Sequence, residues 1–272
     1  DIILRSQGKL VSIGQVEDMK VPWSGRNIPV RIYRPLAKEQ LPVILFLHGG
    51  GYVSGSLETH ENFSRKLANE TSSVVVSVGY SLAPETKFPT PIEEGYAVLQ
   101  WIEQHAARLK INPGKIVVAG DSAGATTATA ISMKTRDLNG PAIALQVLFY
   151  PATNISNFDT PSHKKFGKGY FLTQESMEWT RNLYLRSEED QKHPYASPLL
   201  ADNLTDLPST LLFTAQFDPL SSEGEEYANK LTEAGNNCHL VQVKGVLHGF
   251  ASTSSPKAKQ AFQLVSQKIS AL

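Results

Sequence analysis

The chain has 272 residues, of which 41% are hydrophobic and 19% charged, so it is long enough for one α/β domain with an insertion. Lys and Arg together number 26, as do Asp and Glu, and this zero net charge argues against a nucleic-acid partner or an anionic membrane. Its single cysteine, Cys238, excludes an intramolecular disulfide and a multi-cysteine zinc site, and no apolar run reaches the roughly 20 residues of a membrane span. We therefore expect a cytoplasmic protein.

Short apolar runs alternate with helical stretches along the chain, a pattern that predicts parallel strands joined by helical crossovers. The predicted strands are residues 9–20, 28–33, 43–47, 74–78, 116–119, 143–149, 210–215 and 239–243, with a hairpin turn at 25–27. The predicted helices are residues 58–71 and 90–110, the stretch after Ser122, residues 223–234 and a C-terminal helix that opens at Ser255-Pro256. The aromatic-rich residues 154–194 break this rhythm and contain one helical segment at 173–185. We predict a single domain over residues 1–272, with 154–194 as a cap insertion over the strand ends.

A Gly-x-Ser-x-Gly sequence follows the predicted strand at 116–119 and opens the next helix. A strand that enters and a helix that leaves force a sharp turn, with Ser122 exposed at its tip. Gly120 and Gly124 lack a Cβ, so the strand and the helix can approach closely on either side. The pattern favours a nucleophilic serine over the alternative, an ordinary serine in a glycine-rich turn.

A serine hydroxyl needs a base beside it, and the base needs a third group to orient it. Asp218 follows the predicted strand at 210–215, and His248 follows the last predicted strand, which gives the chain order serine, acid, histidine. The weaker candidates for the acid are Asp202 and Asp206, which precede the strand. The other histidines considered are assigned to structural or surface positions: His105, His163, His193 and His239.

The sequence His48-Gly-Gly-Gly51 ends the buried strand at 43–47. It lacks the spacing and the lysine of a phosphate-binding loop, so a nucleotide site is not expected. Consecutive glycines let backbone N–H groups turn toward a ligand. With the N–H of Ala123, those of Gly50 and Gly51 are candidates for holding an oxyanion, while His48 and Gly49 would position the loop.

These motifs together resemble the hormone-sensitive-lipase family of α/β-hydrolases. The resemblance rests on His48-Gly-Gly-Gly-Tyr52, Gly120-Asp-Ser-Ala-Gly124, Asp218-Pro-Leu220 and His248-Gly-Phe250, in the family's order, with Tyr80-Ser-Leu-Ala-Pro-Glu85 as a further stretch. It implies an α/β-hydrolase fold with an eight-stranded, mostly parallel sheet flanked by helices, and carboxylesterase activity without a metal or cofactor. The nucleophile, base, orienting acid and oxyanion loop carry over to Ser122, His248, Asp218 and Gly50/Gly51.

The chain departs from the family pattern at a few places. Family members often have Gly and Arg where this chain has Ala125 and Ser81, and they carry N-terminal helices over the site. Here the residues before 43 read as strands and connectors. We therefore expect the cap to be reduced to residues 154–194.

The predicted function is that of a serine carboxylesterase acting on short- to medium-chain uncharged esters. The candidate pocket residues are Tyr52, Phe166, Tyr170, Phe171 and Leu247. The alternatives are an amide, carbamate or lactone hydrolase with the same triad, and a non-catalytic small-molecule receptor on the same fold. The receptor is disfavoured because such receptors typically lose a triad member, and a triglyceride lipase is disfavoured because no strongly apolar lid helix is visible. A homodimer through a late edge strand or the cap is a further expectation.

Overall fold

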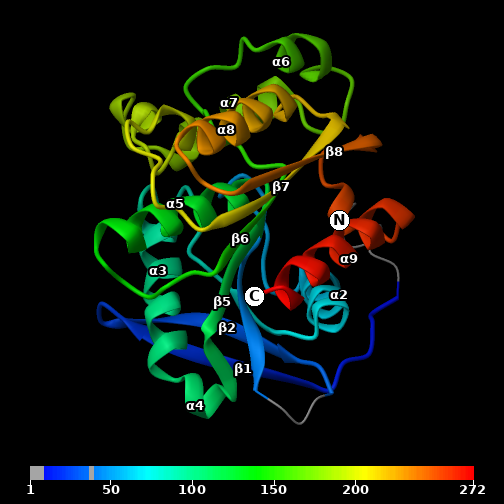
Figure 1. Cartoon of the computed structure of the whole chain (residues 1–272). Helices are drawn as coiled ribbons and strands as arrows, with labels where there is room; N and C mark the ends of the chain where they lie inside the picture. Colours follow the sequence, from blue (N-terminus) through cyan, green and yellow to red (C-terminus); the bar gives the residue numbers. More distant parts are fainter. Residues whose placement is uncertain (1–8, 37–39) are drawn as a thin grey trace.

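One eight-stranded sheet forms the centre of the computed structural model, which describes residues 9–36 and 40–272 (Figure 1). In space its strands lie in the order β1-β2-β4-β3-β5-β6-β7-β8. Strand β2 pairs antiparallel with both of its neighbours, and the remaining pairs are parallel. The strands are β1 Gln15–Trp23, β2 Arg26–Arg34, β3 Leu41–Leu47, β4 Val74–Val78, β5 Ile111–Asp121, β6 Leu145–Phe149, β7 Ser209–Phe217 and β8 Cys238–Leu247. The predicted mostly parallel sheet is therefore confirmed.

Helices cover both faces of the sheet, which explains why the central strands are apolar on both sides. On one face lie α3 (Thr90–Gln104), α4 (Ala106–Leu109), α5 (Ala123–Asp137) and α8 (Ser221–Glu233). On the other lie α2 (Glu61–Thr71) and α9 (Pro256–Ser270). Figure 1 shows α3, α4 and α5 on the left of the sheet and α2 and α9 on the right. Because parallel strands end at the same edge, the loops after β3, β5, β7 and β8 converge there.

The predicted insertion at 154–194 contains two α-helices, α6 (Pro161–Phe166) and α7 (Gln174–Tyr184), which lie at the top of Figure 1. The predicted segment at 173–185 corresponds to α7, and its first turn is closed by a capping box. The Thr173 hydroxyl accepts from the Ser176 N–H, and the Thr173 N–H donates to the Ser176 hydroxyl, both at 3.2 Å. Helix α6 was not predicted, although Thr160 before Pro161 is an ordinary helix start.

Some element boundaries differ from the predicted ones, because local backbone conformation decides where an element ends. The hairpin turn lies at Ser24 and Gly25, which both have positive φ (46° and 75°), and not at 25–27. The first strand begins at Gln15 and not at residue 9. The predicted helix at 90–110 is interrupted at His105 and stops before Lys110, whose φ is 49°.

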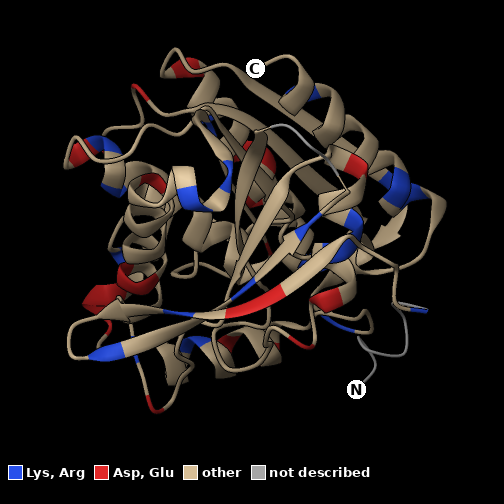
Figure 2. Cartoon of the chain, turned by 90° about the horizontal axis from the view of Figure 1, so that it is seen from below, with Lys and Arg blue, Asp and Glu red and all other residues tan. Residues whose placement is uncertain are grey.

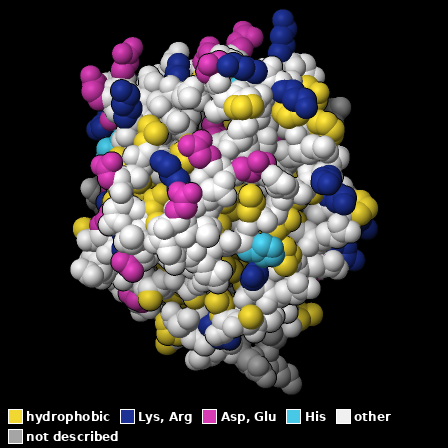
Figure 3. Space-filling model, turned by 45° about the horizontal axis from the view of Figure 1, so that its top comes forward, with side chains coloured by type: hydrophobic (Ala, Val, Ile, Leu, Met, Phe, Trp, Pro, Cys, Tyr) yellow, Lys and Arg dark blue, Asp and Glu magenta, His cyan; other side chains and the backbone are white. Residues whose placement is uncertain are grey.

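Charges of both signs are interspersed over the elements (Figure 2), in keeping with the zero net charge. On the face seen in Figure 3, hydrophobic side chains are scattered among polar ones and do not form one continuous patch. None of the described helices is both long and apolar enough to span a bilayer.

Candidate active site

Ser122 occupies the turn between β5 and α5 in a strained backbone conformation, with φ 54° and ψ −124°. Such a conformation costs about 1–3 kcal/mol in a residue other than glycine, and it persists only where the surroundings enforce it. The Ser122 N–H donates to the Phe149 carbonyl at 2.9 Å, which ties the turn to β6. A Cβ on Gly124 would lie 2.1 Å from the Leu47 carbonyl oxygen, and a Cβ on Gly120 would clash with the backbone of Gly124. Both glycines are therefore required for the turn to close.

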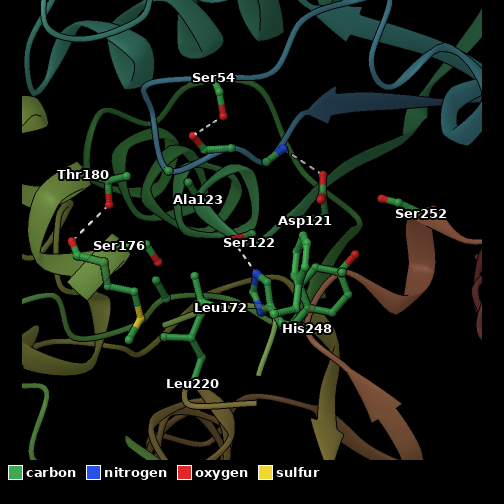
Figure 4. Close-up of a pocket in the computed structure, with 18 of the residues that line it drawn as sticks. Ser54, Asp121, Ser122, Ala123, Leu172, Ser176, Thr180, Leu220, His248 and Ser252 are labelled. Carbon is green, nitrogen blue, oxygen red and sulfur yellow. Dashed lines mark hydrogen bonds between the residues drawn. The ribbon is translucent and has the colours of Figure 1, made fainter. Parts of the chain in front are cut away.

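The three predicted triad side chains meet in one hydrogen-bonded relay. The Oγ atom of Ser122 lies 2.9 Å from Nε2 of His248, and Nδ1 of His248 lies 2.7 Å from Oδ2 of Asp218. Figure 4 shows the bond between Ser122 and His248. The other oxygen of the buried Asp218 accepts from the Leu220 N–H at 2.9 Å. Because an ionised carboxylate only accepts, Nδ1 carries the imidazole proton and Nε2 is free to take the proton of Ser122.

The glycine loop after β3 reaches the cavity that Ser122 lines. Gly50 and Gly51 have φ values of 123° and 62°, which favour glycine. The Gly50 carbonyl accepts from both the hydroxyl and the N–H of Ser54, at 2.9 and 3.0 Å, and this fixes the turn (Figure 4). Ala123, at the start of α5, lines the same cavity, and the first N–H groups of a helix have no intrahelical partner. The three predicted oxyanion donors thus line the same cavity as the serine.

A buried polar cluster holds this loop from behind. The Gly49 N–H donates to the Asp121 carboxylate at 2.8 Å, and His60 lies 3.4 Å from the same oxygen. Burial raises the pKa of Asp121, but His60, the Gly49 N–H and His48 together keep that pKa below its ordinary value. Burial, with His60 nearby, lowers the pKa of His48 to about 4, so its neutral ring donates from Nδ1 to the Gly49 carbonyl at 2.8 Å. The Tyr80 hydroxyl donates to the His48 carbonyl at 2.5 Å.

The relay opens into a cavity of about 660 Å³. In Figure 4, Leu172 and Leu220 lie on one side of the Ser122–His248 pair, and Ser54 with the glycine loop lies on the opposite side. Much of the apolar wall comes from the insertion: Ile155, Phe158, Phe171, Leu172, Met177 and Trp179. A cavity with a few polar groups at one end suits a small, mainly apolar ligand.

The structure brings three of the five predicted pocket residues to this cavity, namely Tyr52, Phe171 and Leu247. It places Phe166 and Tyr170 elsewhere. The Phe166 ring is buried edge-on against Tyr170 at 5.2 Å, and Tyr170 stacks on Phe217 with ring centroids 6.1 Å apart. Phe166 is the last residue of the short helix α6, and its ring packs edge-on against Phe217 at the end of β7, with ring centroids 5.8 Å apart, and does not line the cavity.

Sequence reasoning missed a buried pair of an acid and a histidine, Glu223 and His163, of which Glu223 lines the cavity. Glu223 accepts at Oε1 from the N–H groups of Thr153 and Asn154, at 2.6 and 3.1 Å. Its other oxygen lies 3.8 Å from Nε2 of His163, and neither atom has a hydrogen-bond partner among the described residues. His163, predicted to be a surface residue, is in fact buried. Burial raises the pKa of Glu223 to about 8 and lowers that of His163, so both are neutral near pH 7.

Of the candidates that were set aside, Asp202, Asp206 and His239 lie outside the cavity, and His239 is exposed on β8. Among the described residues, no cluster of His, Cys, Asp and Glu could hold a metal ion. The position of Asp121 directly before Ser122 could have marked it as a residue of the site. Nothing in the sequence, however, indicated its hydrogen bond to the Gly49 N–H.

Comparison with known proteins gives consistent matches. A family model described as alpha/beta hydrolase fold matches residues 44–252. The chain is 38% identical over 241 residues to the carboxylic ester hydrolase LipN of Mycobacterium tuberculosis, a match that covers 86% of this chain and 64% of LipN. It is 35% identical to the ethyl acetate hydrolase of Pseudomonas putida, over 85% of this chain and 74% of that enzyme.

A solved structure supports the same conclusion. The hyperthermophilic esterase of the archaeon Pyrobaculum calidifontis superposes with a TM-score of 0.94 at 38% identity, covering 99% of this chain and 89% of that one. The predicted fold, the resemblance to hormone-sensitive-lipase-type carboxylesterases and the assignment as an ester hydrolase are confirmed by these matches.

Proposed function

The chain belongs to the α/β-hydrolase family, in its hormone-sensitive-lipase branch, and from this premise we propose that Ser122, His248 and Asp218 hydrolyse short- to medium-chain carboxylic esters. The observation that carries the proposal is the continuous relay from Oγ of Ser122 through His248 to Asp218, at 2.9 and 2.7 Å, facing the cavity. A serine activated in this way is a nucleophile for acyl transfer.

In the proposed reaction, Ser122 attacks the ester carbonyl carbon while Nε2 of His248 takes its proton. The N–H groups of Gly50, Gly51 and Ala123 stabilise the negative charge that develops on the carbonyl oxygen. The intermediate collapses to an acyl-serine as His248 protonates the departing alcohol. His248 then removes a proton from water, which attacks the acyl group, and returns this proton to Oγ of Ser122 as the acyl–oxygen bond breaks and the acid leaves.

The substrate range follows from the cavity. Its volume of about 660 Å³ and its apolar wall fit an ester with short or medium chains on either side of the reacting carbonyl. The relative from P. putida is an ethyl acetate hydrolase, which supports small esters. Residues 154–194 supply much of the wall, and we assign them the role of a reduced cap on the single domain.

The test is the rate of hydrolysis of p-nitrophenyl esters of increasing acyl length. Wild type should turn over short chains, and Ser122→Ala should lower kcat by roughly a millionfold, as nucleophile removal does in other serine hydrolases. Ser187→Ala, an exposed serine of the insertion, is the matched control and should behave as wild type. Activity that survives the loss of Ser122 would overturn the assignment of the nucleophile. The homodimer, the lack of nucleic-acid and membrane partners and the cytoplasmic location stay predictions.

A further inference from the structure

Arg181 brings a positive charge to the wall of the substrate cavity. It lies on α7 four residues after Met177 and three before Tyr184, on the helix face that lines the cavity. Of the described residues around the cavity, it is the only lysine or arginine. Its guanidinium offers five N–H donors in a planar group and no acceptor.

The protein itself compensates this charge poorly. Nη1 donates to the Ile155 carbonyl over a long 3.4 Å, and the guanidinium carbon lies 4.9 Å from the ring centre of Phe158. Its Nε is buried without a hydrogen-bond partner among the described residues. No carboxylate in the described ranges comes within 4.0 Å of it, whereas Arg186, just beyond the same helix, pairs with Asp190 at 2.7 Å.

The nearby acids do not supply the missing charge. Asp121 is engaged with Gly49 and His60, and Asp218 with His248. Glu223 holds the loop residues that directly precede Ile155, but burial raises its pKa to about 8, so it is neutral near pH 7. A partly buried cation in an apolar cavity is costly when it lacks an anion, and a bound ligand can supply one.

We propose that Arg181 binds a carboxylate carried by the substrate, so that the preferred substrates are esters that bear a carboxylate away from the reacting ester group. A planar guanidinium matches a carboxylate in shape and in hydrogen bonding, which favours this anion. Arg181 is then a specificity-determining residue. The inference rests on the proposed function, and it departs from the predicted preference for uncharged esters: neutral esters react through the same triad but less efficiently.

The test compares esters that differ in one charged group, with the acid released followed by titration near pH 7. With the carboxylate on the acyl side, monoethyl glutarate is paired with ethyl 5-methylhexanoate, whose isopropyl end has the shape of the carboxylate. With the carboxylate on the alcohol side, 4-acetoxybutanoate is paired with 4-methylpentyl acetate. The readout is the ratio of kcat/KM for the charged ester to that for the neutral one, measured in wild type, Arg181→Met and Arg181→Lys.

In wild type we expect the charged ester to be preferred in one of the two pairs, and the pair that shows it identifies the side that Arg181 faces. Arg181→Met should lower that ratio by about tenfold or more, the range for a hydrogen bond to a charged group, and Arg181→Lys should lower it less. Lys168→Met removes an exposed cation of the same insertion and should leave the ratio unchanged. A wild-type ratio below one in both pairs, or a ratio that Arg181→Met leaves unchanged, would overturn the proposal.

Binding separates this inference from the catalytic one. In a Ser122→Ala background, calorimetry should show that monoethyl glutarate or 4-acetoxybutanoate binds more weakly by about tenfold or more once Arg181 is also replaced by Met. That loss would support the role of Arg181 even if wild type hydrolysed no ester, an outcome that would count against the proposed function alone. Equal binding with and without Arg181 would refute the carboxylate site.

Discussion

The buried Glu223 should make the stability of the fold depend on pH. Its carboxyl group is 1% exposed, and the titratable groups around it are His163 on α6, Asp218 before α8 and Glu226 on α8 itself. Burial raises its pKa from 4.5 to about 8. The folded protein therefore holds this proton more tightly than the unfolded chain does. The resulting contribution to stability is fully present below about pH 4.5 and is lost as the pH rises through about 8.

The size of the effect follows from the two pKa values. Between about pH 5 and pH 9, the contribution of Glu223 to the free energy of unfolding should fall by about 4 kcal/mol. Glu223→Gln removes the ionisation and keeps a carbonyl oxygen that can accept from Thr153 and Asn154. The amide nitrogen of the glutamine would face Nε2 of His163, which has no partner among the described residues.

The assay is urea unfolding of wild type and Glu223→Gln at several values between pH 5 and pH 9. We expect wild type to lose stability relative to the variant as the pH rises, with most of the loss complete by about pH 8. Glu226→Gln changes an exposed position on the same helix, and its free energy of unfolding should depend on pH as that of wild type does. Parallel curves for wild type and Glu223→Gln would show that Glu223 is ionised in the folded protein, and the reasoning from burial would fail.

Three further outcomes can be checked directly. Asp218→Asn should lower kcat near pH 7 by about 10⁴-fold in the ester assay, because the amide no longer selects the productive tautomer of the histidine. Gly124→Ala should lower the free energy of unfolding by at least about 1–3 kcal/mol in urea, since its Cβ would lie 2.1 Å from a backbone oxygen. Phe171→Ala should change the acyl-length preference in kinetic assays, whereas Phe166→Ala should cost about 3–5 kcal/mol of stability and leave that preference alone.

The fold and the triad were predictable because their signals are local in sequence. The apolar run 43–47 specifies a strand covered on both faces, and Ser122 is flanked by glycines whose absent Cβ atoms the turn requires. Asp218 and His248 each directly follow a strand, so the parallel sheet brings them to the same edge as the serine. Chain order and strand ends are sufficient to assemble a triad from residues far apart in sequence.

The pocket was less predictable, because its walls depend on how residues 154–194 pack and not on a periodic pattern of hydrophobic residues in the sequence. Phe166, Tyr170 and Phe171 looked equivalent in the sequence, yet only Phe171 lines the cavity. The other two rings pack against Phe217 at the end of β7. Aromatic residues bury similar areas in either place, so composition alone does not distinguish a pocket wall from a local core.

Glu223 and Arg181 form hydrogen bonds to the same loop, and from this we predict how the substrate specificity changes with pH. Glu223 holds Thr153 and Asn154, and Arg181 contacts the next residue, Ile155. As the pH rises through about 8, Glu223 ionises, and its negative charge offsets the positive charge of Arg181. The preference for esters that bear a carboxylate should therefore decline above pH 8 in wild type and persist in Glu223→Gln, as measured by the ratio of kcat/KM for charged and neutral esters. If the ratio in Glu223→Gln declined in step with wild type, the two groups would not be coupled, and the charge at Arg181 would have to be compensated in another way.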